Sequence, residues 1–325
     1  MHVIIIYVSL ISHCGIKAAK DGYSYFDLLL FKHFTFLIED LKIMKKFTTA
    51  LVAGALILGS SVVNADMSTW FAETEIAANV RLATDYQFYG ASQTSGAGGN
   101  DAGTSIQGGF DITWFTIDAI GADVYSGVFA ANVEWGRGTN DPAGLEFTHY
   151  HGLAGEFGDT GLSWDVGGIN YTYPNQDADQ GLSDDFDYWE FYGVFGYGFA
   201  DVMFEPSFSV GYYYSPEWFG FGDASHHIPV SLDFSLPYGI GLNAFFGHLS
   251  LEFSDANLAA QTTGAGGTAD NYQYFGFGLS KTILGVDVDA SYTALSSDND
   301  CALVQTGNIG GSQCGGFIFG VSKSF

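Results

Sequence analysis

The 325-residue sequence predicts an all-β protein: a closed antiparallel transmembrane β-barrel of about 12 strands, with short periplasmic turns and long extracellular loops. Three observations lead to this prediction. Apolar and polar residues alternate along most of the second part of the chain, as they do in strands with two different faces. The connections between the alternating stretches are short and long in turn, an asymmetry typical of outer-membrane barrels. Aromatic residues gather near the strand ends, where membrane barrels carry interfacial girdles.

The composition excludes two other classes of protein. The chain has 36 acidic against 10 basic residues and a formal net charge of −26, so it cannot bind nucleic acid by neutralising phosphates. Its hydrophobic content of 47 % and aromatic content of 17 % exclude intrinsic disorder. We therefore expect a folded, acidic protein with no nucleic-acid partner.

The N-terminal part carries a secretion signal. Met44 and two lysines precede an apolar run and a small-residue cleavage site that ends at Ala65, so 44–65 is interpreted as a signal peptide. Residues 1–43 are then an upstream extension translated from a wrong start codon. The alternative, a membrane anchor near the N-terminus, is disfavoured because its apolar stretch is too short to span a bilayer. The barrel domain is expected over 66–325.

Alternation along the barrel domain locates the strands. Near residue 230, for example, Ile228 and Leu232 share one face of the chain, whereas Ser231 and Asp233 share the other. Three of the predicted strands, the fourth, fifth and ninth, carry apolar residues on both faces, so alternation does not assign their orientation. The predicted strands lie near 77–91, 105–115, 127–135, 145–157, 162–173, 186–197, 203–215, 226–236, 240–253, 271–281, 286–295 and 315–325.

Alternation alone does not say which face of the sheet is wet. A soluble sandwich or lipocalin-like barrel would bury the apolar face. Soluble sheets usually protect their edges with lysine, whereas the chain after the signal peptide has only two lysines, and a closed barrel has no edges. These features favour a lipid-facing apolar surface. The aromatic residues expected near the strand ends are Tyr86, Phe88, Trp114, Trp135, Tyr171, Tyr173, Trp189, Tyr212 and Tyr214.

The end of the chain indicates where the protein is assembled. Phe325 closes an alternating aromatic strand and resembles the terminal signal that the bacterial barrel-assembly machinery recognises. We therefore expect the outer membrane of a Gram-negative bacterium as the location. The expected partners are outer-membrane lipid, lipopolysaccharide and the assembly machinery. The sequence leaves the oligomeric state open.

Several blocks of the sequence resemble the TorF family of porins. They are 84–94 (TDYQFYGASQT), 107–111 (QGGFD), 171–174 (YTYP), 214–220 (YSPEWFG) and 321–325 (VSKSF), within a resemblance that covers about residues 76–325. The resemblance implies a proteobacterial outer-membrane barrel with a porin-like role. Members of the family usually carry Arg where this chain has Gln87 and Tyr89, so it also implies a lumen that has lost two positive charges.

The sequence predicts a channel for passive diffusion of small cationic or neutral solutes, because carboxylates in a confined lumen attract cations. About twelve strands lie between filled eight-stranded and wide sixteen-stranded barrels, so we expect a narrow pore. The alternative is a non-conducting barrel that acts in adhesion, recognition or lipid binding through its loops, with Tyr89, Tyr188 and Tyr192 plugging the lumen. Alternation assigns these residues to the pore lining: Arg81, Asp85, Gln87, Asp111, Glu134, Glu190, Glu205, Asp233, Asp287 and Asp289.

Three further groups of residues are candidate sites. Cys301 and Cys314 lie in one long loop and are expected to form a disulfide in an oxidising compartment. His149 and His151 point to the same side of a strand, but no third ligand accompanies them, so a metal site is disfavoured. The aspartates within 177–187 lack the calcium-loop pattern and are expected to form a solvated acidic loop. No motif such as G-x-S-x-G is present, so neither an enzyme nor a cofactor is predicted.

Overall fold

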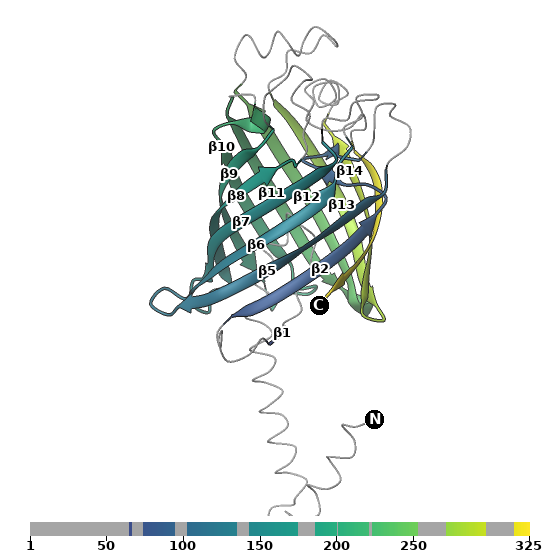
Figure 1. Cartoon of the computed structure of the whole chain (residues 1–325). Coiled ribbons are helices and arrows are strands. Elements are labelled where there is room, and N and C mark those ends of the chain that lie inside the picture. The colour runs from purple at the N-terminus through teal and green to yellow at the C-terminus, as the bar shows by residue number, and fades with distance from the viewer. Residues whose placement is uncertain are drawn as a thin grey trace, which may run out of the picture. The chain divides into compact units, whose positions relative to one another are not determined.

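A closed antiparallel β-barrel makes up the part of the chain that the structure, a computed structural model, describes (Figure 1). The described residues are 65–66, 74–94, 103–134, 143–174, 186–199, 201–220, 223–252, 271–296 and 315–325. The predicted upstream extension and all but the last residue of the predicted signal peptide lie outside them. Among the described residues, no helix combines the length and apolar character needed to cross a bilayer.

Twelve strands form the barrel wall, and a thirteenth, the two-residue strand β1 (Ala65–Asp66), pairs with the start of the first of them. Short 3₁₀ turns lie at η3 (Trp218–Gly220) and η4 (Pro237–Gly239). The wall strands are β2 (Glu75–Ala83), β5 (Ser105–Ile117), β6 (Ala122–Asn132), β7 (Leu145–Glu156), β8 (Leu162–Thr172), β9 (Tyr188–Gly198), β10 (Ser207–Ser215), β11 (Ser225–Leu236), β12 (Ile240–Leu251), β13 (Asn271–Ile283), β14 (Val286–Leu295) and β15 (Gly316–Ser324).

Strand β2 closes the barrel. Its Arg81 is opposite Ser322 of β15 on one side and Gln107 of β5 on the other, so the first and last strands share a continuous ladder. The last residue extends this seam, because the Phe325 N–H donates to the Ala78 carbonyl at 2.9 Å and the Ala78 N–H donates back at 3.2 Å. Closure pairs backbone groups that would otherwise form two open edges.

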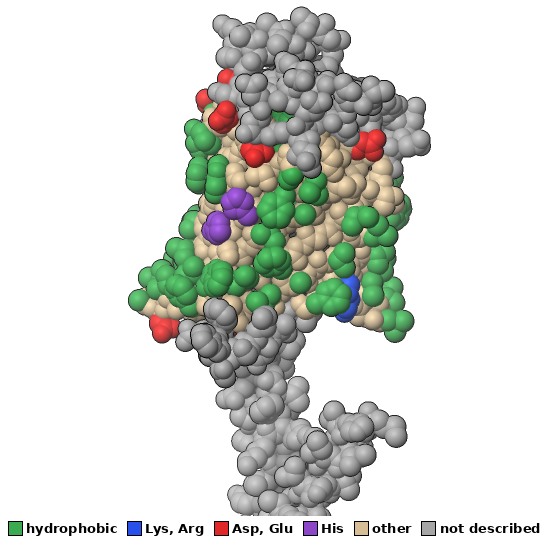
Figure 2. All heavy atoms as spheres, viewed as in Figure 1, with side chains coloured by type: hydrophobic (Ala, Val, Ile, Leu, Met, Phe, Trp, Pro, Cys, Tyr) green, Lys and Arg blue, Asp and Glu red, His purple; other side chains and the backbone are tan. Residues whose placement is uncertain are grey.

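The two faces of the wall differ as the alternation predicts. On β11, Leu232 is 42 % exposed on the outer surface, whereas the neighbouring Ser231 is 1 % exposed and faces the lumen. On β15, Phe319 is 58 % exposed, whereas Ser322 points inward. Figure 2 shows hydrophobic side chains spread over the visible outer wall. The outer wall is therefore an apolar belt around a largely polar interior.

The connections also alternate in length, as predicted. Five short turns of two to eight residues join β5 to β6, β7 to β8, β9 to β10, β11 to β12 and β13 to β14. The other connections, after β2, β6, β8, β10, β12 and β14, are longer and meet at the opposite end of the barrel. We call these two ends the short-turn end and the long-loop end.

The largest difference from the prediction concerns the first strand. Alternation predicts that it reaches residue 91, but β2 ends at Ala83, and the chain then turns into the lumen. Tyr86 and Phe88, predicted to be outward aromatic residues, are therefore buried inside the barrel. Tyr171 and Tyr173 are also buried there, because they continue the inward face of β8 that carries Asp165 and Ile169. In contrast, Trp114, Trp189, Tyr212 and Tyr214 are exposed on the outer surface as predicted, and Trp135 lies outside the described residues.

Candidate functional site

Residues 84–94 form a hairpin inside the barrel, which we call the luminal hairpin. Its strands β3 (Gln87–Phe88) and β4 (Ala91–Ser92) pair only with each other and form a separate two-stranded sheet. Tyr89 and Gly90 connect them with φ values of 49° and 82°, the pair of positive values that a tight hairpin turn requires. A side chain at Gly90 would also meet Tyr274 of β13, since its Cβ would lie 2.7 Å from the Tyr274 Cβ.

A buried carboxylate holds the stem of the luminal hairpin together. Asp85 accepts hydrogen bonds from the Ser92 hydroxyl at 2.6 Å, the Thr94 hydroxyl at 2.7 Å and the Gln87 amide at 3.3 Å. Burial raises the pKa of Asp85, and these hydrogen bonds oppose that shift. The Gln93 N–H donates to the Tyr86 carbonyl at 2.6 Å, so the two ends of the hairpin lie side by side.

The tip of the luminal hairpin reaches the opposite wall. The Tyr89 hydroxyl donates to both carboxylate oxygens of Glu190 on β9, at 3.0 and 2.9 Å. Its carbonyl accepts from the Tyr272 hydroxyl of β13 at 2.9 Å, and its ring lies 3.9 Å from that of His227 on β11. Nearer the stem, the Tyr86 hydroxyl donates to Glu146 of β7 at 2.8 Å. The hairpin therefore crosses the lumen.

Aromatic side chains fill the lumen around the luminal hairpin. Phe88 and Tyr89 stack on Trp218 of η3, with ring centroids 6.2 and 5.6 Å apart. Trp218 and its neighbour Phe219 are almost completely buried although they belong to a connection at the long-loop end. We call the following residues the aromatic layer: Phe88, Tyr89, Tyr171, Tyr188, Trp218 and Phe219.

A cavity of about 720 Å³ lies in the lumen between the luminal hairpin and the short-turn end. It reaches that end because Gly239 and Gly241, in and beside the turn between β11 and β12, are part of its wall. Aromatic residues of the wall include Tyr213, Phe245 and Tyr274. Its polar wall includes Arg81, Asp85, Gln87, Gln107, Ser209, Asp233, Asn243, Ser280, Asp287 and Asp289.

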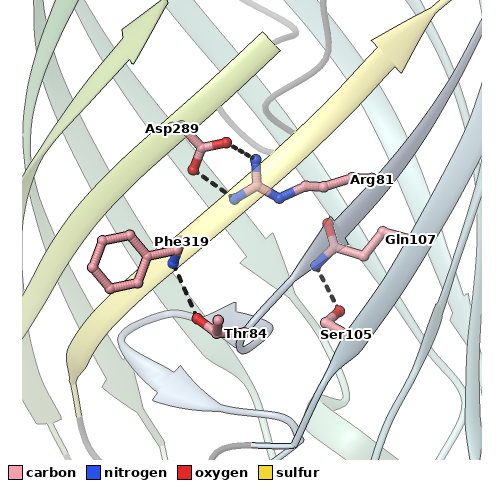
Figure 3. A network of polar contacts seen from close by, with 6 residues as sticks. All are labelled: Arg81, Thr84, Ser105, Gln107, Asp289 and Phe319. Carbon is pink, nitrogen blue, oxygen red and sulfur yellow. Dashed lines mark hydrogen bonds and ion pairs between the residues drawn. The ribbon is translucent and has the colours of Figure 1, made fainter. Parts of the chain in front are cut away.

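An ion pair spans one side of the cavity. The Arg81 guanidinium of β2 donates to the two oxygens of Asp289 on β14 at 2.5 and 2.8 Å, reaching across β15 (Figure 3). Gly320 of β15 leaves room for it, because a Cβ there would collide with the guanidinium. Below this pair in Figure 3, the Thr84 hydroxyl accepts a hydrogen bond from the Phe319 N–H at 3.0 Å, at the point where the chain leaves the wall.

The other half of the lumen is filled by tyrosines that donate to carboxylates. Tyr150 bonds Asp111, and Tyr125 donates to Asp165 at 2.6 Å. Tyr192 donates to the same Asp165 oxygen at 3.4 Å. These acids are satisfied by neutral hydroxyl groups. Within the described ranges, Arg81 and Lys281 are the arginine and lysine residues on the wall of the luminal cavity.

Glycines make room for these tyrosines on the neighbouring strand. Gly127 is directly opposite Tyr150, and a Cβ at Gly127 would overlap the tyrosine ring. The same relation holds for three more cross-strand pairs: Gly152 with Tyr125, Gly167 with Tyr192, and Gly247 with Tyr274. Some of the 44 glycines of the chain are thus positions against which a luminal tyrosine ring packs flat on the barrel wall.

The structure separates the ten predicted lining residues into three groups. Arg81, Asp85, Gln87, Asp233, Asp287 and Asp289 lie on the cavity wall. Asp111 and Glu190 point inward but are held by tyrosines outside the cavity. The prediction was wrong for the other two: Glu134 lies beyond the end of β6, and Glu205 lies in the turn before β10, where its φ is 42°, and both are exposed.

Sequence reasoning missed two buried luminal acids, Glu146 and Asp165. Both belong to predicted strands with apolar residues on both faces, where inward-facing Ala154 and Ile169 hide the alternation. Glycine opposite an inward tyrosine is the signal that could have assigned these faces. The glycine–tyrosine pairs of β6 with β7 and of β8 with β9 would do so once the strands are aligned.

The remaining candidates carry no site in the described part of the chain. His149 and His151 lie on the outer surface with ring centroids 5.7 Å apart, and the His149 ring packs 5.5 Å from that of Trp189. Within the described ranges, no three His, Cys, Asp or Glu residues are grouped to hold a metal ion. Cys301, Cys314 and the aspartates of 177–185 lie outside the described residues.

A family model described as a bacterial protein of unknown function (Gcw_chp) matches residues 69–310. The chain belongs to the Gcw_chp family. The matching family model is not named TorF, so the similarity to the TorF family stays a resemblance. No curated protein matches this Gcw_chp chain.

Three solved structures are examples of those to which the Gcw_chp chain is similar. The NanC porin is 9 % identical, with 75 % of this chain and 97 % of that chain covered and a TM-score of 0.43. An outer-membrane channel from Pseudomonas putida F1 is 10 % identical, with coverages of 80 % and 100 % and a TM-score of 0.44. LpxR from Salmonella typhimurium is 8 % identical, with coverages of 77 % and 99 % and a TM-score of 0.40.

Proposed function

We propose that the protein is an outer-membrane channel for passive diffusion of small cationic or neutral solutes. The observation that carries this proposal is the polar cavity of about 720 Å³, which reaches from the short-turn end to the luminal hairpin in the middle of the barrel. A barrel that served only as a scaffold would need no such space, and interiors normally pack without voids of this size. The cavity is therefore interpreted as one vestibule of a narrow pore.

The outer surface supports a membrane location. The wall strands have 9 to 13 residues, the length that a tilted strand needs to cross a bilayer, and most of their outward side chains are apolar. By analogy with other outer-membrane barrels, the short-turn end is periplasmic and the long-loop end is outside. Lipid and lipopolysaccharide would then surround the belt, and the barrel-assembly machinery would insert it.

The charge of the cavity wall supports a preference for cations. The cavity wall includes four aspartates, at positions 85, 233, 287 and 289, against Arg81 and Lys281, so it carries more acids than bases. Asp289 is paired with Arg81, whereas Asp85 and Asp233 accept hydrogen bonds from neutral donors. Carboxylates in a confined lumen raise the local concentration of cations. The Debye length is about 8 Å at physiological salt, so the preference requires a pore as narrow as this cavity suggests.

One observation favours a second function. The aromatic layer closes the described lumen towards the long-loop end, as expected of a non-conducting barrel that uses its loops for adhesion, recognition or lipid binding. The two functions differ in what happens when the luminal hairpin is removed. A channel would then conduct continuously, whereas a filled barrel would still be blocked by its wall tyrosines.

Single-channel recording in planar bilayers tests the channel function. Because the Tyr86 carbonyl and the Gln93 N–H are hydrogen-bonded, residues 87–92 can be replaced by two glycines that form a tight turn. We expect this shortened protein, folded as judged by circular dichroism, to give stepwise currents. A folded shortened protein that stays silent would contradict the channel and support the non-conducting barrel.

A further inference from the structure

We propose that the luminal hairpin is a gate that swings away from Glu146 and Glu190 to open the pore. This inference rests on the proposed channel function and adds its regulation. The hairpin is one short segment of the described chain that crosses the lumen from wall to wall. Moving it breaks no pairing of the barrel strands. Its displacement would remove Phe88 and Tyr89 from the aromatic layer that separates the cavity from the long-loop end.

The luminal hairpin is built to move as one body. Its two strands pair with each other alone, and the Asp85 carboxylate ties the stem to Ser92 and Thr94 within the same segment. At its base, Thr84 exchanges hydrogen bonds with Phe319 of β15, and the carbonyls of Gln93 and Thr94 accept from the N–H groups of Glu134 and Gly103. A unit with internal bonds that is attached at its base can swing at its tip without unfolding.

Few polar bonds hold the hairpin across the lumen. Two are tyrosine hydroxyls that donate to carboxylates: Tyr86 to Glu146 and Tyr89 to Glu190. Two more reach backbone carbonyls at the tip, from the Tyr272 hydroxyl to Tyr89 and from the Gly315 N–H to Gly90. The remaining contacts include aromatic faces, such as Phe88 on Tyr171 and Tyr89 on Trp218.

Removing the two tyrosine hydroxyls tests the gate. Each hydroxyl bonds a carboxylate, and losing one such bond shifts an equilibrium by about tenfold. We therefore expect Tyr86→Phe/Tyr89→Phe to raise the fraction of time that single channels are open by at least about tenfold, with the size of each current step unchanged. Tyr150→Phe is the matched control, because it removes the same kind of bond, to Asp111, within the wall.

The outcomes separate the gate from the channel. If the protein shortened at 87–92 conducts but the double variant opens no more often than the unaltered protein, the gate is wrong and the channel stands. If Tyr150→Phe raises the open fraction as much as the double variant, the effect is a general loosening of the lumen, and the gate is again wrong. If the shortened protein is silent, the channel function itself fails.

Discussion

At the scale of single residues, luminal tyrosines depend on the glycines opposite them. A methyl group at Gly247 would overlap the ring of Tyr274, so the ring would have to leave the wall, as overpacked cores do. We expect Gly247→Ala to lower the free energy of unfolding by about 1–3 kcal/mol. Denaturant unfolding in detergent micelles, followed by tryptophan fluorescence, measures this change.

Gly198→Ala provides the control for that prediction. Gly198 ends β9, and a Cβ added there would have no other atom within 4 Å, so an alanine side chain meets nothing. We expect its stability to be unchanged or higher by roughly 0.5 kcal/mol, because alanine loses less backbone entropy than glycine on folding. Equal destabilisation of both variants would show that the pairing with tyrosine is not the cause.

Arg81 moderates the charge of the lumen. It lies on the cavity wall, and Asp289 is its partner. Arg81→Gln should therefore increase the preference for cations, which the reversal potential in a KCl gradient reports. Lys323→Gln removes the same charge from the outer surface and should leave the reversal potential unchanged. An unchanged reversal potential in Arg81→Gln would contradict this role of Arg81, because loss of a charge that permeating ions sense must change the selectivity.

At the scale of elements, β15 joins the end of the chain to its beginning. The backbone of Phe325 exchanges two hydrogen bonds with Ala78 of β2, so the last residue completes the ladder that closes the barrel. Deleting Phe325 should sharply reduce the amount of folded protein in the outer membrane, although chain ends usually tolerate change. Membrane fractionation with immunoblotting measures the yield.

The control for that deletion lies on the same strand. Phe319→Ala removes another outward aromatic side chain and keeps the backbone ladder intact. We expect this variant to reach the membrane in nearly normal amounts. Normal yield of the Phe325 deletion would show that the seam forms without its last residue and that no terminal signal is read there.

At the scale of the whole molecule, the orientation of the barrel is open to a direct test. Glu217 is exposed at the long-loop end, and Met203 is exposed in a short turn. In a chain with Cys301 and Cys314 replaced by serine, Glu217→Cys should react with an impermeant thiol reagent on intact cells, and Met203→Cys should react only after lysis. The reverse pattern would invert the proposed topology.

The barrel itself could be predicted from the sequence, because its signals are local. A period of two along each strand decides which side chains face outward, and the lengths of successive connections decide at which end they meet. Strands such as β11, β14 and β15 could be placed within a few residues on this basis. Four of the cavity-wall residues, Arg81, Asp233, Asp287 and Asp289, followed from the same alternation.

What fills the barrel depends on tertiary contacts that no local pattern reveals. Residues 84–88 continue the alternation of β2, so nothing local distinguishes Tyr86 and Phe88 from outward aromatic residues. The segment turns inward because Glu146, Glu190 and Tyr272, far away in the chain, form hydrogen bonds with Tyr86 and Tyr89 across the lumen. Which tyrosine hydroxyl bonds which carboxylate depends on the register of neighbouring strands and on the diameter of the closed barrel. No single segment of the sequence determines that register or that diameter.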